Sequence, residues 1–323
     1  MLINNKEEIG MRIRKLMAVV MTVAMAFTMV ACGGTSTSGE SSGDTSEETS
    51  TEASGTVGFS VSTLNNPFFV TLTDGAEAKA KEAGIELIVV DAGDDAAKQA
   101  SDIEDLLSKN ISVLIVNPVD SDAVAPAVED AIAQGVKVIA VDRGVNGVEI
   151  DCSIASDNVA GAKMATEYLV TLVGEGAKVA ELEGVPGASA TIDRGEGFHV
   201  VADEQLDVVS KQTANFNRSE GMTVMENMLQ ANADIQGVFA HNDEMALGAL
   251  EAISGKEIVV VGFDATDDAI AAIKEGKMAA TVAQQPELMG STAVETAVKL
   301  LAGETVEASI PVEVTLITAD NAE

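Results

Sequence analysis

Short apolar segments rich in valine and isoleucine recur along the chain from residue 56 and alternate with longer amphipathic stretches. The first four apolar segments are residues 56–62 (TVGFSVS), 85–92 (IELIVVDA), 113–118 (VLIVNP) and 136–143 (VKVIAVDR). Residues 66–84 and 94–110, which lie between them, have the spacing of surface helices. Nearly continuous apolar strands that alternate with helices predict a parallel sheet covered on both faces.

The same pattern starts again in the second half of the chain. Its apolar segments are residues 177–184, 206–214, 237–243, 257–264 and 278–284. In total the pattern indicates about ten strands, more than one compact doubly wound sheet usually carries. We therefore predict an α/β protein with two doubly wound parallel-sheet lobes.

Polar side chains stand at the carboxyl ends of several predicted strands: Asn117, Asp142, Arg143, Asn242, Asp264 and Gln284. Asparagine and aspartate are common turn formers, so some of these residues could serve the turn alone. In open parallel sheets, however, ligands bind outside the carboxyl ends of the strands. Two such edges facing each other would make a cleft lined by amides, carboxylates and guanidinium groups.

Such a cleft suits a neutral ligand rich in hydroxyl groups. A sugar hydroxyl both donates and accepts hydrogen bonds, so its site needs acceptors and donors side by side. Asp142 and Asp264 are acceptors, and Arg143 and Arg194 are donors. The amides Asn66, Asn117, Asn242 and Gln284 can do both.

The segment STLNNPFF, residues 62–69, places two aromatic rings together in a chain that is only 3% aromatic. Phe68 and Phe69 either fill the core beneath the first helix or, with Phe216, stack against the C–H faces of a sugar. Asn66 either caps the helix that Pro67 begins or binds the ligand.

The first 31 residues have the features of an export signal. Arg12, Arg14 and Lys15 precede a charge-free apolar run of residues 16–31, which is shorter than the ~20 residues a membrane span needs. The run ends in Met-Val-Ala-Cys, which resembles a bacterial lipobox with Met29 in place of the usual leucine. We predict a signal peptide over residues 1–31, with translation starting at Met1 or Met11, and lipidation of Cys32.

Residues 32–55 follow as a tether of small, polar and acidic residues without a large aliphatic side chain. The whole chain has a formal charge of −33, which argues against nucleic acid as a partner. Cys152 is the other cysteine, so the lipidated protein could form no internal disulfide. We expect Cys152 to be a small buried hydrophobic residue rather than a nucleophile.

Six motifs together resemble the periplasmic ribose-binding proteins of ABC sugar transporters: STLNNPFF, NPVDSDAV, IASDNVAG, RGEGF, HNDEMALGAL and VGFDATDD. The resemblance runs from Thr56 to about Ile317. It implies two doubly wound lobes joined by a three-strand hinge, as in periplasmic binding proteins of type I, with a sugar enclosed between the lobes. The crossings would lie near residues 156–157, 284–285 and 312–313.

The resemblance also implies a set of sugar-binding residues, none of them replaced in this chain: Asn66, Phe68, Phe69, Asn117, Asp142, Arg143, Arg194, Phe216, Asn242, Asp264 and Gln284. The lobes implied are residues 56–156 with 285–312, and residues 157–284 with 313–323. The chain departs from the family pattern nearby, at residues 191–193 and at His241. We expect His199 and His241 to be solvated or at the rim of the cleft.

The function expected is an extracytoplasmic lipoprotein that captures D-ribose, or a similar monosaccharide, as a monomer and delivers it to the transmembrane subunits of an ABC permease. Another pentose, a furanosyl signal, or presentation of the ligand to a chemoreceptor are the alternatives. No nucleophile elbow, Walker loop, dinucleotide fingerprint or clustered metal ligands occur, so we expect no enzyme, cofactor or metal. The lactose-repressor type of sugar sensor shares this fold, but the export signal excludes it.

Overall fold

The computed structural model describes residues 55–322. The predicted signal peptide, Cys32 and nearly all of the tether lie outside these residues. Within residues 55–322, no helix has the length and hydropathy that a membrane span requires. The described residues contain two six-stranded sheets, each flanked by helices, and this confirms the predicted α/β fold with two lobes.

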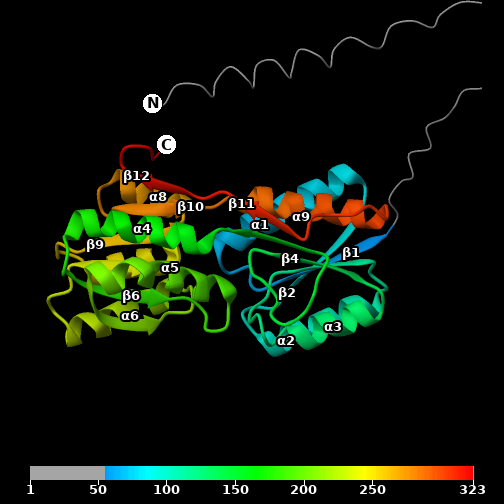
Figure 1. Ribbon diagram of the computed structural model, residues 1–323, viewed down its shortest axis with the longest axis horizontal. Helices are drawn as coiled ribbons and strands as arrows, with labels where there is room; N and C mark the ends of the chain where they lie inside the picture. The colour runs from blue at the N-terminus through cyan, green and yellow to red at the C-terminus, as the bar shows by residue number, and fades with distance from the viewer. Residues whose placement is uncertain (1–54, 323) are drawn as a thin grey trace, which may run out of the picture. The chain divides into compact units, whose positions relative to one another are not determined.

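The first lobe contains a parallel sheet of order β11-β5-β4-β3-β1-β2. Its strands are β1 (Thr56–Val61), β2 (Glu86–Asp91), β3 (Val113–Val116), β4 (Lys137–Val141), β5 (Cys152–Ser156) and β11 (Ser309–Val312). Helices α1 (Pro67–Ala83) and α9 (Pro286–Leu301) pack together on one face, and α2 (Ala96–Ser108) and α3 (Ala125–Ala133) cover the other (Figure 1). Cys152 is fully buried in this lobe, as expected.

The second lobe repeats this topology with the sheet order β12-β10-β9-β8-β6-β7. Its strands are β6 (Lys178–Glu183), β7 (Asp207–Thr213), β8 (Gly237–Ala240), β9 (Val259–Asp264), β10 (Ala280–Ala283) and β12 (Thr315–Thr318), of which β12 runs antiparallel to β10. Helices α4 (Asn158–Val173) and α5 (Ser189–Gln205) pack on one face. The other face carries α6 (Arg218–Ala231), α7 (Asp243–Ala252) and α8 (Asp267–Lys274).

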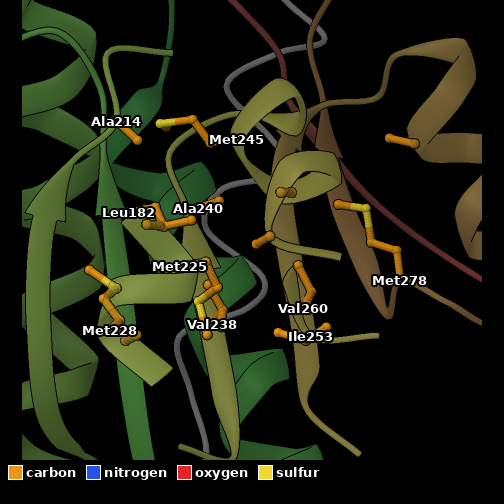
Figure 2. Packing of buried hydrophobic residues seen from close by; sticks show 14 of the residues in the cluster. Leu182, Ala214, Met225, Met228, Val238, Ala240, Met245, Ile253, Val260 and Met278 are labelled. Atoms are coloured by element: carbon orange, nitrogen blue, oxygen red, sulfur yellow. The ribbon is translucent and has the colours of Figure 1, made fainter. Parts of the chain in front are cut away.

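Methionine side chains fill much of the core beneath α6 and α7. Figure 2 shows Met225, Met228 and Met245 packed around Leu182 and Val238 of the sheet. Methionine is unbranched and flexible, so it fills irregular spaces between a sheet and two helices. This core packs against β6 and β8, and this packing positions the ends of the two strands that face the first lobe.

The chain passes between the two sheets three times. It leaves β5 for α4 at residues 156–158, leaves β10 for α9 at residues 283–286, and leaves β11 for β12 at residues 312–315. The side-chain amide of Gln285 donates a 3.1 Å hydrogen bond to the carbonyl oxygen of Glu313, so two of the crossings are tied together.

Candidate binding site between the two lobes

Ten of the eleven predicted binding residues line one cavity with about 230 Å³ of empty space. From the first lobe come Asn66, Phe68, Phe69, Asp142 and Arg143; the others are Arg194, Phe216, Asn242, Asp264 and Gln284. Ala190, which the sequence did not indicate, also contributes to the wall. The eleventh residue, Asn117, lies directly behind, fully buried, with its amide 3.4 Å from the Asp142 carboxylate.

The strand ends bring these polar residues together, as the sequence predicted. Asp142 directly follows β4, Asp264 is the last residue of β9, and Gln284 directly follows β10. Asn66 stands before α1, where its side chain accepts a 2.9 Å hydrogen bond from the backbone N–H of Phe68. Asn66 therefore caps the helix and lines the cavity at the same time, so the two roles considered for it are compatible.

Three cavity residues have backbone conformations that side chains other than glycine rarely adopt. The φ angles are +65° at Asp142, +57° at Phe216 and +123° at Asp264. Such conformations cost about 1–3 kcal/mol each and persist where the surroundings determine them, often at ligand sites. These backbone conformations lower the stability of the fold, and they direct two carboxylates and one ring into the cavity.

The charges in the cavity are arranged as two close pairs, one from each lobe. Arg143 Nε lies 3.7 Å from Asp142 Oδ2, and Arg194 Nη1 lies 3.7 Å from Asp264 Oδ1. All four residues are buried. Burial raises the pKa of Asp142 and, more strongly, that of Asp264, and it lowers the pKa values of both arginines. The neighbouring opposite charges act against these shifts.

Three buried polar atoms in the cavity wall have no hydrogen-bond partner in the protein. They are Asp142 Oδ1, Arg143 Nε and Gln284 Oε1. An unpaired buried polar group is costly, so such atoms in a cavity indicate a ligand that supplies the missing partner. Two acceptors and one donor together suit a ligand whose groups both donate and accept, such as adjacent hydroxyls.

The three phenylalanines give the cavity its apolar walls. Phe68 and Phe69 meet edge to face, with ring centroids 5.2 Å apart, and both are also part of the core of the first lobe. The Arg143 guanidinium lies between two rings, 5.0 Å from the centroid of Phe69 and 5.3 Å from that of Phe216. Phe68 and Phe69 therefore belong to the core and also line the cavity, and their stacking on a sugar stays a prediction. Arg143 is held by cation–π contacts.

A wider surface hollow, with about 2100 Å³ of empty space, lies against α7 and α8 of the second lobe. It is open to solvent and contains none of the predicted site residues. Unlike the cavity between the lobes, it has no buried polar side-chain atom that lacks a partner. We therefore take the smaller cavity as the functional site.

A family model described as a periplasmic binding protein domain matches residues 57–305. The chain belongs to the periplasmic binding protein family.

Two curated relatives and a solved structure agree with this membership. The ribose import binding protein of Bacillus subtilis (strain 168) is 56% identical over 265 residues, which cover 81% of this chain and 87% of that protein. The ribose import binding protein of Haemophilus influenzae is 49% identical over 269 residues, or 82% and 92% of the two chains. A solute binding protein from Bacillus halodurans C-125, solved with bound myo-inositol, has a TM-score of 0.79 and 35% identity; the match covers 85% and 98% of the two chains.

The binding protein holds Arg194 with residues that the sequence did not single out. Arg194 Nε donates to Asn158 Oδ1 at 2.8 Å, and Nη1 donates to the carbonyl oxygen of His241 at 2.6 Å. The guanidinium also lies 3.9 Å from the ring centroid of Phe263. Asn158 is inside the motif IASDNVAG, but the motif gives no sign that its side chain faces α5.

Asp243 is a second unpredicted residue behind the cavity of this binding protein. Its carboxylate accepts hydrogen bonds from Thr281 Oγ1 at 2.7 Å and from the backbone N–H of Thr266 at 2.8 Å. Burial raises the pKa of Asp243 to about 7, against these hydrogen bonds. Because Thr266 follows Asp264 and Ala265, which both have positive φ angles, Asp243 anchors the turn that presents Asp264.

The expectation for His241 was wrong. Its ring is fully buried rather than solvated or at the rim, and Nε2 lies 2.9 Å from Glu181 Oε1. Burial lowers the pKa of His241. His199 is half-buried and binds the other oxygen of Glu181 at 3.0 Å. The sequence could not indicate this cluster, because Glu181 lies in β6 between the apolar Ala180 and Leu182, and no local pattern places it beside the two histidines.

Proposed function

We propose that this chain is an extracytoplasmic, lipid-anchored binding protein that captures D-ribose between its two lobes and delivers it to an ABC permease. The observation that carries the proposal is the cavity in which Asp142 Oδ1, Arg143 Nε and Gln284 Oε1 lack partners beside three aromatic rings. A pentose has hydroxyls for these atoms and C–H faces for the rings. The ribose import binding proteins among the relatives support the choice of sugar.

We assign the sugar-binding role to the eleven residues predicted from the sequence. Asn117 would act from behind by orienting the Asp142 carboxylate, and the other ten would contact the sugar. The lobes would consist of residues 56–156 with 285–312 and residues 157–284 with 313–323, and the three crossings would form the hinge. Cys32 would carry the lipid. The protein would be a monomer, and the permease would recognise its closed form.

Titration calorimetry of the purified protein tests the assignment of the ligand. D-ribose should bind more tightly than D-xylose, D-arabinose, D-glucose, D-galactose or myo-inositol. A hexose would have to place an additional hydroxymethyl group in the same cavity, and we expect it to bind more weakly than ribose. Equal or tighter binding of another sugar in this panel would show that ribose is not the preferred ligand. The proposed binding function would still stand. Failure of every sugar to bind would refute the proposed function.

A second candidate function keeps the same site and changes the ligand. The solute binding protein from Bacillus halodurans was solved with myo-inositol, so a related fold can hold a cyclic polyol. The same titration separates the two candidates. Presentation of the ligand to a chemoreceptor would use the same closed protein and differ in the membrane partner.

A further inference from the structure

Helix α5 of the second lobe begins without a capping side chain of its own. Its N-cap residue is Ala188, which has no side-chain oxygen to accept from the first backbone N–H groups. The N–H of Ser189 instead donates a 3.2 Å hydrogen bond to Ser121 Oγ, which belongs to the first lobe. One lobe therefore caps a helix of the other.

Two further hydrogen bonds join the lobes at the same place. The N–H of Ser121 donates to the carbonyl oxygen of Gly187 at 3.0 Å, and the N–H of Gly144 donates to Ser189 Oγ at 2.9 Å. We call Ser121, Gly144, Gly187 and Ser189 the serine latch. Apart from the three crossings, all hydrogen bonds found between the lobes within residues 55–322 belong to this latch.

The lobes are in close contact at the latch. Ser121 is fully buried, and a Cβ atom on Gly187 would collide with the carboxylate of Asp120. That carboxylate is itself fixed, because it accepts hydrogen bonds from the backbone N–H groups of Asp122 and Ala123. Gly187 also has a φ of +86°, which favours glycine. The contact thus requires the specific residues present on both sides.

The latch is adjacent in sequence to the cavity on both lobes. Gly144 directly follows Arg143, while Ser189 directly precedes Ala190 and shares helix α5 with Arg194. None of the four latch residues lines the cavity. Closure of the lobes would therefore form the latch and complete the cavity in the same movement.

We propose that Ser121 and Ser189 set the sugar affinity of this protein without contacting the sugar, because their hydrogen bonds stabilise the closed state. This inference rests on the proposed function as a sugar-binding protein that closes. The apparent dissociation constant equals the intrinsic one divided by the fraction of protein in the binding-competent state. A weaker latch lowers that fraction for every sugar alike.

Single substitutions in the latch give the direct test. In the full chain, Ser121→Ala and Ser189→Ala should each weaken ribose binding by roughly three- to tenfold, the effect of one lost hydrogen bond. The loss should appear as faster dissociation with a nearly unchanged association rate, because the latch forms after encounter. The ratio of affinities for ribose and the next-best sugar of the panel should stay within twofold of wild type.

Ser101→Ala is the matched control. Ser101 is an exposed serine of α2 in the first lobe, whose Oγ donates to the carbonyl oxygen of Ala97 in the same helix. It should leave affinity and both rates unchanged. Unchanged dissociation rates in both latch variants would overturn the proposal, and so would a change in the sugar ratio as large as the change in affinity.

Hydrogen exchange of the backbone N–H of Ser189 provides a second measurement that does not depend on affinity. Ribose should slow this exchange in wild type and slow it less in Ser121→Ala; equal protection in the two proteins would overturn the latch. If Ser121→Ala does not fold, Ser189→Ala is judged by the exchange of the Gly144 N–H. If wild type binds no sugar, the proposed function fails. The latch proposal then still predicts that, without ligand, the Ser189 N–H exchanges faster in Ser121→Ala than in wild type.

Discussion

The side-chain amide of Gln284 donates a 2.7 Å hydrogen bond to Asp264 Oδ1. Gln284 stands at the crossing from β10 to α9, while Asp264 ends the neighbouring strand β9. The side-chain oxygen of Gln284, Oε1, has no partner in the protein. One side chain therefore connects a crossing between the lobes, a buried carboxylate and the proposed ligand.

Gln284→Ala should weaken ribose binding by at least tenfold. The substitution removes an acceptor for the sugar and leaves the buried Asp264 side chain with one hydrogen bond fewer, and leaving a buried polar group unpaired costs about 1–3 kcal/mol. Gln285→Ala is the matched control, because Gln285 is exposed and lies outside the cavity. The measurement is calorimetric titration of both variants with ribose. Equal affinities of Gln284→Ala and Gln285→Ala would show that Gln284 is not part of the site.

Asp243 should make the protein less stable as the pH rises through neutrality, and the other two buried aspartates, Asp142 and Asp264, act in the same direction at their own raised pKa values. Each has a folded-state pKa raised by burial, to about 7 for Asp243. A raised pKa means that the folded state holds a proton that the unfolded state has released. The stabilisation is complete below the unfolded pKa and is lost as the pH rises through the folded value.

The test is the free energy of unfolding of ligand-free protein between about pH 6.5 and pH 8. His241, whose pKa burial lowers, acts in the opposite direction only below about pH 6.5, its ordinary pKa. One such proton contributes a slope of at most about 1.4 kcal/mol per pH unit. Asp243→Asn should reduce the slope, and the exposed Asp267→Asn should preserve it. A wild-type slope of zero or of opposite sign would contradict the prediction.

Gly184→Ala should weaken sugar binding by at least tenfold. A Cβ atom at Gly184 would collide with the ring of Phe216, which forms a wall of the cavity. The ring would have to move into the space that the ligand needs. Gly184 has no positive φ angle, so the effect is one of steric contact and not of backbone strain.

Gly195→Ala is the control for this substitution. The nearest atoms to a Cβ at Gly195, in the turn that follows Arg194, are His241 Cε1 at 3.6 Å and Glu181 Oε1 at 3.7 Å, which are ordinary contacts. Alanine in place of glycine inside a helix stabilises it by up to about 1 kcal/mol. Gly195→Ala should therefore bind ribose as wild type does. If both variants bind alike, the Phe216 ring is not a wall that the ligand needs.

Cys32→Ser should abolish the attachment of lipid to the protein. The prediction rests on the sequence, since Cys32 lies outside the described residues. Metabolic labelling with a fatty acid should mark wild type and the control Cys152→Ser, whose cysteine is fully buried in the first lobe. Label on Cys32→Ser equal to that on wild type would contradict lipidation at this position.

The sequence predicted most of the fold because nine strands contain short apolar runs and stand out as separate segments. The three strands it did not indicate are β5, β11 and β12. β11 and β12 are edge strands with mostly exposed or half-buried residues, and the residues of β5 alternate between buried and half-buried. Such strands lack a continuous apolar run, although the family resemblance located the crossings beside them.

The candidate site could be predicted only in part. Strand ends, turn chemistry and family motifs pointed to the residues whose side chains enter the cavity. The supporting contacts of Asn158, Asp243 and Glu181 depend on which elements lie side by side, and no local pattern carries that information. The positive φ angle of Phe216 is equally invisible, because phenylalanine does not favour that conformation. Aspartate adopts it more often, but the sequence does not show which aspartate does so, and Asp142 therefore did not stand out.

Ribose should draw the two lobes together about the three crossings. Asp142 and Arg143 come from the first lobe and Arg194 and Asp264 from the second, so neither lobe alone supplies enough partners for a buried sugar. A ligand that contacts both lobes binds the closed state more tightly than the open one and shifts the population toward it.

Small-angle scattering is the suitable measurement of closure. Intrinsic fluorescence would report little, because the chain has no tryptophan and its single tyrosine, Tyr168, is on α4 and not among the residues of the cavity. A chain that begins at residue 55 should show a smaller radius of gyration at saturating ribose than without it. Arg194→Ala, at a concentration of ribose that does not saturate it, should keep the larger value. An unchanged radius in wild type, with binding confirmed by calorimetry, would contradict closure and leave capture without movement.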